Sequence, residues 1–162
     1  MEPALYPGSF DPITHGHLNI IERARDMGIF SEITVLLAIN PNKVPLFAVE
    51  ENMELIRRTT SQWSEVKVDF TEGLITDYAH KKNIRIAIRG LRAVTDFENE
   101  FSMALTNRDL WSEFDTLFLM THSDYMYLSS TVVRQVAQMG GEVGRFVPVC
   151  VAEKLREKFG YS

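Results

Sequence analysis

The apolar residues of this chain follow two alternating patterns. Short, nearly continuous apolar runs end at Tyr6 and cover residues 33–39, 66–70, 84–88 and 116–120, as expected for strands buried on both faces. Between them, apolar residues recur at helical spacing from residue 18 to a stop at Gly28, and over 50–63, 74–82, 96–111, 130–139 and 151–159. Strands that alternate with helices form right-handed crossovers, which favour a parallel sheet covered by helices.

The number and order of these elements predict the fold class. We expect an α/β protein, with a Rossmann-like, doubly wound sheet of five parallel strands and helices on both faces. The 162 residues, 45% of them apolar, are enough for a full hydrophobic core, and no repeat or linker interrupts the pattern. We therefore expect a single domain over residues 1–162.

Composition narrows the cellular setting and the partners. The chain has no apolar run long enough to span a membrane and no signal-peptide pattern, so we expect a cytoplasmic protein. Its single cysteine, Cys150, has no partner for an internal disulfide, which agrees with a reducing compartment. A net charge of −5 argues against a broad surface for nucleic acid or for an acidic membrane. Any anionic ligand must therefore be met by a local cluster of cations.

Polar and cationic residues gather in the segments that follow four of the predicted strands. In a doubly wound sheet, ligands bind beyond the carboxyl ends of the strands, so these segments should meet at one edge. Scattered Lys and Arg residues are usually solvated surface charge, but their joint placement after successive strands favours a binding site. The segments hold Ser9 and His17, residues 40–43, residues 89–92, and residues 123–125 with 129–131.

The first of these segments carries the clearest chemistry. Between Tyr6 and His17 it combines a glycine turn, a hydroxyl and two histidines just before an amphipathic helix. His17 is expected at or near the N-terminus of that helix, where free backbone N–H groups and the helix dipole favour an anion. Gly16 has no Cβ and lets a phosphate or a ribose approach the main chain closely. The segment therefore predicts a phosphate site.

The same residues resemble the signature of a known superfamily. GSFDP at residues 8–12 and HGH at 15–17 are similar to the nucleotidylyltransferase signature, and this alone indicates only the superfamily. Further motifs, in order and spacing, resemble the phosphopantetheine adenylyltransferases over essentially the whole chain. They are NPNK at 40–43, IRGLRAV at 88–94, DFE at 96–98 with Glu100, NR at 107–108 and LSST at 128–131. RGLRA followed by DFE is the most specific of them.

The resemblance implies a reaction and a mechanism. Members of this family transfer the adenylyl group of ATP to 4′-phosphopantetheine, giving dephospho-coenzyme A and pyrophosphate in the penultimate step of coenzyme A synthesis. An acceptor phosphate oxygen would attack the α-phosphorus in line, without a covalent enzyme intermediate. His17 matches the catalytic histidine and would donate a hydrogen bond to the α-phosphate in the transition state. His15, at a position where the family varies, is interpreted as local structure.

The resemblance also implies which residues bind the two substrates. On the acceptor side, Lys43 and Arg89 would hold the phosphate of phosphopantetheine, because cations there offset the repulsion from ATP. The other acceptor residues would be Ser9, Leu74, Ile75 and Asn107, although a core role is equally open for Leu74 and Ile75. The ATP side would be formed by Ser9, Phe10, His17, Gly90, Leu91, Arg92, Glu100, Tyr125, Met126, Tyr127, Leu128, Ser129, Ser130 and Thr131. Residues 129–131 also open a helix, so capping and phosphate binding can both hold.

Three further expectations come with the resemblance. Mg²⁺ should accompany ATP, and because the sequence shows no dedicated carboxylate cluster, nucleotide oxygens and water would hold most of it. The family is typically homohexameric, and coenzyme A is a feedback ligand of the family. Four residues depart from the family's usual pattern and bear on substrate affinity more than on the reaction: Asn40, Asn42, Asn99 and Gln135.

Other functions stay open. Another adenylyltransferase, for example one acting on nicotinate mononucleotide, would share the first motif but would not be expected to carry Lys43 with residues 89–92. A cytidylyltransferase would normally have a different motif at residues 129–131. A non-catalytic nucleotide-binding module is the alternative from a different class, and the presence of His17, Lys43, Arg89 and Arg92 counts against it.

Overall fold

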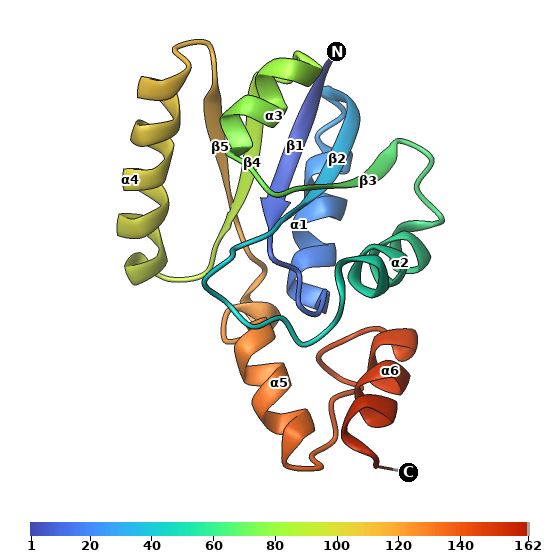
Figure 1. The fold of residues 1–162 in the computed structure, drawn as a ribbon. Coiled ribbons are helices and arrows are strands. Elements are labelled where there is room, and N and C mark those ends of the chain that lie inside the picture. The colour runs from blue at the N-terminus through green and yellow to red at the C-terminus, as the bar shows by residue number, and fades with distance from the viewer. Residues whose placement is uncertain (162) are drawn as a thin grey trace.

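The protein folds around one five-stranded parallel sheet (Figure 1). The computed structural model describes residues 1–161, apart from the side chains of Val94 and Thr95. The strands are β1 (Glu2–Gly8), β2 (Phe30–Ala38), β3 (Val66–Thr71), β4 (Ile86–Leu91) and β5 (Asp115–Met120), in the order β3-β2-β1-β4-β5. The predicted α/β fold with five parallel strands is confirmed.

Helices cover both faces of the sheet. On one face lie α1 (His15–Asp26) and α2 (Val49–Thr60), and on the other lie α3 (Ile75–Lys82) and α4 (Val94–Leu110). Two further helices, α5 (Ser130–Gln138) and α6 (Val149–Phe159), pack together beyond the carboxyl ends of the strands, and a 3-10 turn (η1, Ser123–Tyr125) precedes α5. Within residues 1–161 no helix has the length and the apolar character needed to cross a membrane.

Each face of the sheet has its own hydrophobic core. Ala4 and Val35 point into the larger core under α1 and α2, whereas their neighbours Leu5 and Leu36 point into the smaller core under α3. Successive side chains of a strand point to opposite faces, so a strand that is covered on both sides needs apolar residues at every position. This explains the nearly continuous apolar runs of the sequence.

One predicted element is corrected by the structure. The sequence pattern predicts a strand over residues 84–88 followed by a loop at 89–92, but β4 covers Ile86–Leu91. Its pairing with β5 continues through Arg89, Gly90 and Leu91, opposite residues 118–120. A glycine beside an arginine normally marks a turn, and here the long-range pairing overrides that local preference. These three residues therefore belong to the paired end of a strand and not to a loop, and the pairing with β5 fixes their backbone.

The strand order places a crevice between β1 and β4. β1 is central and pairs with both β2 and β4. The chain first moves from β1 outward to β3 and then returns to the other side of β1 for β4 and β5. Neighbouring connections leave a sheet in opposite directions at such a switch point, and ligands bind there. Ser9 follows β1 and Arg92 follows β4, so the fold brings these two predicted residues to the same crevice.

Candidate active site

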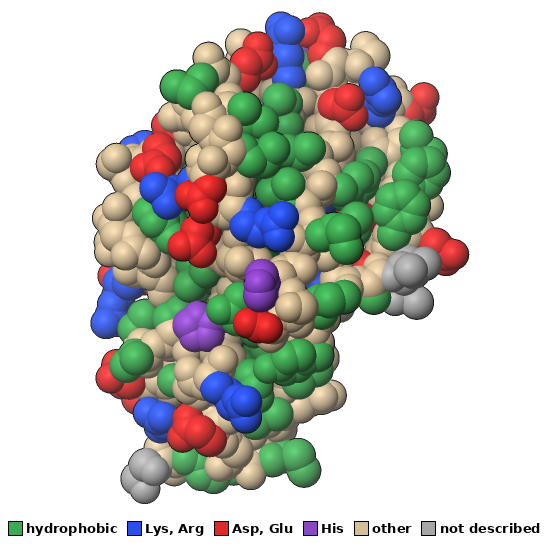
Figure 2. All heavy atoms as spheres, turned by 180° about the vertical axis from the view of Figure 1, so that it is seen from behind, with side chains coloured by type: hydrophobic (Ala, Val, Ile, Leu, Met, Phe, Trp, Pro, Cys, Tyr) green, Lys and Arg blue, Asp and Glu red, His purple; other side chains and the backbone are tan. Residues whose placement is uncertain are grey.

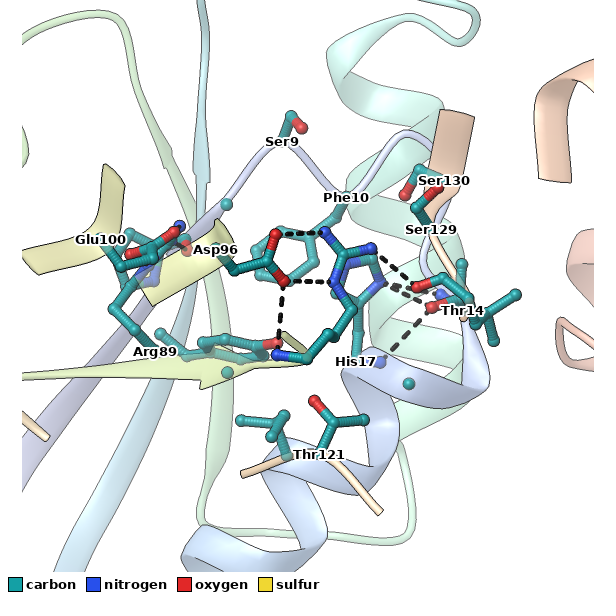
Figure 3. A pocket seen from close by; sticks show the side chains of 18 of the residues that line it. Ser9, Phe10, Thr14, His17, Arg89, Asp96, Glu100, Thr121, Ser129 and Ser130 are labelled. Atoms are coloured by element: carbon teal, nitrogen blue, oxygen red, sulfur yellow. Dashed lines mark hydrogen bonds and ion pairs between the residues drawn. The ribbon is translucent and has the colours of Figure 1, made fainter. Parts of the chain in front are cut away.

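A cavity of about 340 Å³ opens at the crevice between β1 and β4 (Figure 3). Its walls come from the β1–α1 segment, the start of α1, the end of β4, the first half of α4 and the start of α5. The cavity brings together most of the predicted site residues: Ser9, Phe10, His17, Arg89, Gly90, Arg92, Glu100, Leu128, Ser129, Ser130 and Thr131.

His17 is fixed at the start of α1 by reciprocal hydrogen bonds with Thr14. Thr14 is the N-cap residue, and its hydroxyl accepts the backbone N–H of His17 at 3.4 Å. In return, the backbone N–H of Thr14 donates to Nδ1 of His17 at 3.0 Å, and the Thr14 hydroxyl lies 3.1 Å from the same nitrogen. This is a capping box in which histidine replaces the usual Glu or Gln.

The capping box determines which ring nitrogen carries a proton. Because Nδ1 accepts a backbone N–H, it is unprotonated, and in the neutral ring the proton is on Nε2. Burial lowers the pKa of His17 to about 3, with further lowering by the charges of Arg92 and Arg89. His17 is therefore a neutral Nε2–H donor at physiological pH, and this donor is available to a ligand in the cavity.

The two cations of the cavity are each held by a carboxylate of α4. The guanidinium of Arg89 donates from Nε and Nη2 to the two oxygens of Glu100, at 2.7 and 2.5 Å, and from Nη1 to the carbonyl of Pro7. Burial alone would lower the pKa of Arg89, but Glu100 outweighs this effect and raises it. Arg89 is thus a rigid, fully charged group whose remaining N–H groups can serve a ligand.

Arg92 is anchored in a similar way. Its Nε donates to Asp96 at 3.0 Å, and its Nη1 donates to the backbone carbonyl of Leu128 at 2.9 Å. The second contact links the end of β4 to the segment that leads into α5. Figure 3 shows Arg89, Asp96 and His17 around the same space, with the ion pair and the capping box drawn as dashed lines.

The start of α5 forms the opposite wall. The hydroxyl of Ser129 caps the helix by accepting the backbone N–H of Val132 at 3.2 Å, as the sequence predicts. The hydroxyl of Ser130 donates to the carbonyl of Pro12 at 2.8 Å and fixes this helix end against the β1–α1 segment. The backbone N–H groups of the first helical turn have no partner within the helix, so they favour an anion in the cavity.

Phe10 and Gly90 shape the floor of the cavity. The ring of Phe10 is buried between Tyr6 and His17, with centroids 5.1 and 5.0 Å away, so a ligand in the cavity can meet mainly its backbone. A Cβ on Gly90 would lie 2.9 Å from Cγ1 of Ile20. Only glycine lets α1 approach β4 this closely, and this brings His17 next to the cations of β4.

Lys43 lies in a second cavity next to the first. This cavity has a volume of about 320 Å³ and shares Ser9, Ser130 and Thr131 with the first. Arg134 of α5 also lines it. A ligand placed at Ser9 can therefore face His17 on one side and Lys43 on the other.

Seven predicted residues line neither of these two cavities. Ile75 packs against the smaller core, which agrees with the core role left open for it, and Leu74 is the exposed N-cap residue of α3. Tyr125 lies beside Gly16, and Asn107 lies near the end of α4. The binding roles of these residues stay predictions, as do those of the other three: Leu91, Met126 and Tyr127.

Sequence reasoning missed several residues of the site. Thr14 orients His17, and its three-residue spacing from His17 matches that of a capping box, a signal that the sequence contains. Asp96 pairs with Arg92 at a spacing of four residues, but Arg92 precedes α4 and Asp96 lies in its first turn, so helical spacing alone does not predict the pair. Tyr6, Asn99 and Thr121 also line the cavity.

The two carboxylates of the cavity, Asp96 and Glu100, are the acidic side chains there that could bind a metal ion. Within the part of the chain that the structure describes, no group of three or more His, Cys, Asp and Glu side chains could hold a metal ion. Asp96 and Glu100 are each paired with an arginine. A metal at this site would therefore take most of its ligands from a substrate and from water.

The low pKa of His17 predicts how the free energy of unfolding depends on pH. Below about pH 6.5 the unfolded chain protonates this histidine, whereas the folded protein does not until about pH 3, so protons favour the unfolded state in that window. His17→Gln keeps a side-chain oxygen for the capping box but removes the titration. Between pH 7.5 and 4.5, wild type should lose about 2–3 kcal/mol more unfolding free energy than the variant in urea unfolding. Equal pH dependence of the two proteins would contradict a partly buried imidazole that stays neutral.

Comparison with known proteins places the chain in a family. A family model described as cytidylyltransferase-like matches residues 5–136. A phosphopantetheine adenylyltransferase of Carboxydothermus hydrogenoformans is 50% identical over 98% of this chain and 97% of the relative. That of Heliobacterium modesticaldum is 49% identical over 99% of this chain and 94% of the relative. That of Caldanaerobacter subterraneus subsp. tengcongensis is 48% identical over the full length of both.

Solved structures agree on the fold. Nicotinic acid mononucleotide adenylyltransferase of Plasmodium falciparum, complexed with NaAD, superposes with a TM-score of 0.68. The match covers 98% of this chain and 96% of that protein, at 13% identity, which shows a shared fold only. The family follows from the three bacterial relatives, which are about half identical over nearly the full length of the chain. The chain therefore belongs to the phosphopantetheine adenylyltransferase family, within the cytidylyltransferase-like proteins.

Proposed function

We propose that this protein transfers the adenylyl group of ATP to 4′-phosphopantetheine, giving dephospho-coenzyme A and pyrophosphate, by direct in-line attack. The observation that carries the proposal is the neutral Nε2–H donor of His17, fixed by Thr14 between two anchored arginines and the N-terminus of α5. Such a donor stabilises charge that develops on a phosphoryl group without a change of its own protonation state. The names of the full-length relatives support the choice of acceptor.

The cations are placed so that two polyanions, ATP and the phosphorylated acceptor, can bind next to each other. Arg92 and the start of α5 would bind the phosphates of ATP, and Arg89 with Lys43 would bind the acceptor phosphate. Because Arg89 and Arg92 are already held by Glu100 and Asp96, little further ordering is needed when the substrates arrive. This arrangement favours catalysis by positioning and charge stabilisation, which is what phosphoryl transfer requires.

Mg²⁺ would enter with ATP. The two carboxylates of the cavity are committed to arginines, so nucleotide oxygens and water would supply most of the metal's ligands. Bound in this way, the metal would neutralise charge on the pyrophosphate that leaves. Coenzyme A carries the same pantetheine arm as the acceptor, so its feedback would act by competition for the acceptor half of the site.

The proposal also includes assembly of the protein as a homohexamer and its location in the cytoplasm. Figure 2 shows hydrophobic side chains gathered over α4, on the right of that view. Apolar side chains that are 42–56% exposed on this helix are Phe97, Phe101, Met103, Leu105 and Leu110. An apolar face of this kind favours burial against another copy of the chain. The free thiol of Cys150 is in keeping with the reducing cytoplasm.

The proposed reaction is tested by release of pyrophosphate. ATP and Mg²⁺ are supplied with 4′-phosphopantetheine and, in parallel, with nicotinate mononucleotide; CTP with glycerol 3-phosphate is the third pair. Release with phosphopantetheine alone is expected. Release with another pair would overturn the acceptor, and no release with any pair would favour a non-catalytic binding module.

His17→Ala should lower kcat by about 10² or more and change the KM for ATP much less, because the Nε2–H bond matters most in the transition state. Steady-state kinetics with both substrates varied measure this split. His15→Ala is the matched control: His15 does not line the cavity, and its loss should cost far less. Equal losses in kcat and in ATP affinity would contradict the proposed role of His17.

Lys43→Ala should raise the KM for phosphopantetheine by about tenfold or more, because it removes a charge-assisted hydrogen bond to the acceptor phosphate. The KM for ATP should stay near the wild-type value. Lys81→Ala, on the exposed side of α3, controls for the loss of one positive charge. An unchanged acceptor KM in the Lys43 variant would remove this residue from the site.

A further inference from the structure

Asp11 is a buried carboxylate in the β1–α1 segment. Its side chain is only 10% exposed, and four donors converge on it. Oδ2 accepts the backbone N–H of Leu46 at 2.7 Å and Nη1 of Arg134 at 3.3 Å. Oδ1 accepts the backbone N–H of Phe47 at 3.1 Å and Nδ2 of Asn52 at 3.0 Å. Both oxygens are therefore fully used, by donors from three different elements.

These contacts join parts of the chain that are far apart in sequence. Asp11 lies two residues after Ser9, in the β1–α1 segment. Leu46 and Phe47 belong to the segment over residues 39–48, which connects β2 to α2 and carries Lys43. Arg134 comes from α5. Asp11 thus ties the Lys43 segment and α5 to the strand end that holds Ser9, at the junction of the two cavities.

The Lys43 segment has few other anchors near the lysine. Lys43 and Val44 are exposed, and the backbone N–H of Lys43 bonds only to the carbonyl of Asn40, within its own turn, at 3.1 Å. Arg134, itself held by Asp11, donates to the carbonyl of Val44 at a long 3.5 Å. The buried ring of Phe47 fixes the far end of the segment. The direction in which the segment leaves Phe47 then depends on the two backbone bonds to Asp11.

Only a carboxylate can accept all four donors. In asparagine, the amide nitrogen would replace either Oδ1 or Oδ2, and in both orientations it would face two N–H donors instead of accepting from them. The volume of the side chain stays almost unchanged. Asp11→Asn therefore removes the hydrogen bonds from two of the four donors, while the packing stays nearly intact.

We propose that Asp11 is a positioning residue that sets Lys43 toward the acceptor phosphate. By holding the backbone at Leu46 and Phe47, it keeps the segment over residues 39–48 next to Ser9, so that Lys43 and Ser9 approach the same phosphate. Asp11 lines the second cavity, but both of its oxygens are taken up by the four protein donors, so it would act on the phosphate through the lysine. The inference rests on the proposed role of Lys43 in acceptor binding.

A double-mutant cycle with Lys43 tests the inference. Asp11→Asn should raise the KM for phosphopantetheine about tenfold, as expected for the loss of hydrogen bonds to a charged group, and change the KM for ATP about twofold or less. Asp11→Asn combined with Lys43→Ala should have the same acceptor KM as Lys43→Ala alone, because Asp11 acts through the lysine. Asp26→Asn, at the exposed end of α1, is the matched control and should behave as wild type.

Amide hydrogen exchange supplies a readout that does not depend on the reaction. Asp11→Asn should speed exchange at Leu46 and Phe47, while the core strands keep their protection. If Asp11→Asn folds poorly, Asn52→Ala removes one donor and keeps the carboxylate. It should raise the acceptor KM about twofold to fivefold, again without effect in the Lys43→Ala background.

The possible failures are distinguishable. Additive effects of Asp11→Asn and Lys43→Ala, or an equal rise in the KM for ATP, would overturn the positioning role while the proposed reaction stands. Unchanged exchange at Leu46 and Phe47 would do the same. If Lys43→Ala leaves the acceptor KM unchanged, the acceptor site itself is assigned wrongly, and the role of Asp11 falls with it.

Discussion

The site depends on the reciprocal hydrogen bonds between Thr14 and His17. A partly buried imidazole that is free to turn could present either nitrogen, in either protonation state, to a ligand. Here the N–H of Thr14 occupies Nδ1, which fixes the ring, selects the Nε2–H form and starts α1 at the same point. One local interaction at the beginning of a helix thus defines the orientation, the tautomer and the position of the group proposed to act on the α-phosphate.

The electrostatic surroundings of His17 serve two purposes. The charges of Arg89 and Arg92 disfavour a second positive charge on the imidazole, so its pKa falls and it stays neutral. The same charges attract phosphates into the cavity. Glu100 and Asp96 hold the two guanidinium groups in place, so the cations remain aligned before any polyanion arrives. A neutral donor surrounded by fixed cations is a preorganised environment for charge that develops on a phosphoryl group.

The sequence carries much of the fold and the location of the site. Apolar runs that fill both faces of a strand predict all five strands, and the topology then brings Ser9, His17 and Arg92 together. The sequence pattern does not predict which distant segments pair with each other. The end of β4 depends on its register with β5, and Asp11 meets backbone groups 35 and 36 residues further along the chain. No local sequence pattern predicts such contacts. The capping box is different, because Thr14 and His17 are three residues apart and a local rule that admits histidine would find it.

Nitrogen-15 NMR of the protein labelled in its imidazole rings measures the protonation state of His17 directly. Titration from pH 7.5 to 4.5, with His17→Gln used to assign the signal, should show one ring that keeps a protonated Nε2 and an unprotonated Nδ1 throughout. This follows from a pKa of about 3 and from the bond between Thr14 and Nδ1. An imidazolium signal for His17 at pH 6, or a neutral ring protonated on Nδ1, would show that the site does not hold His17 as a neutral Nε2–H donor.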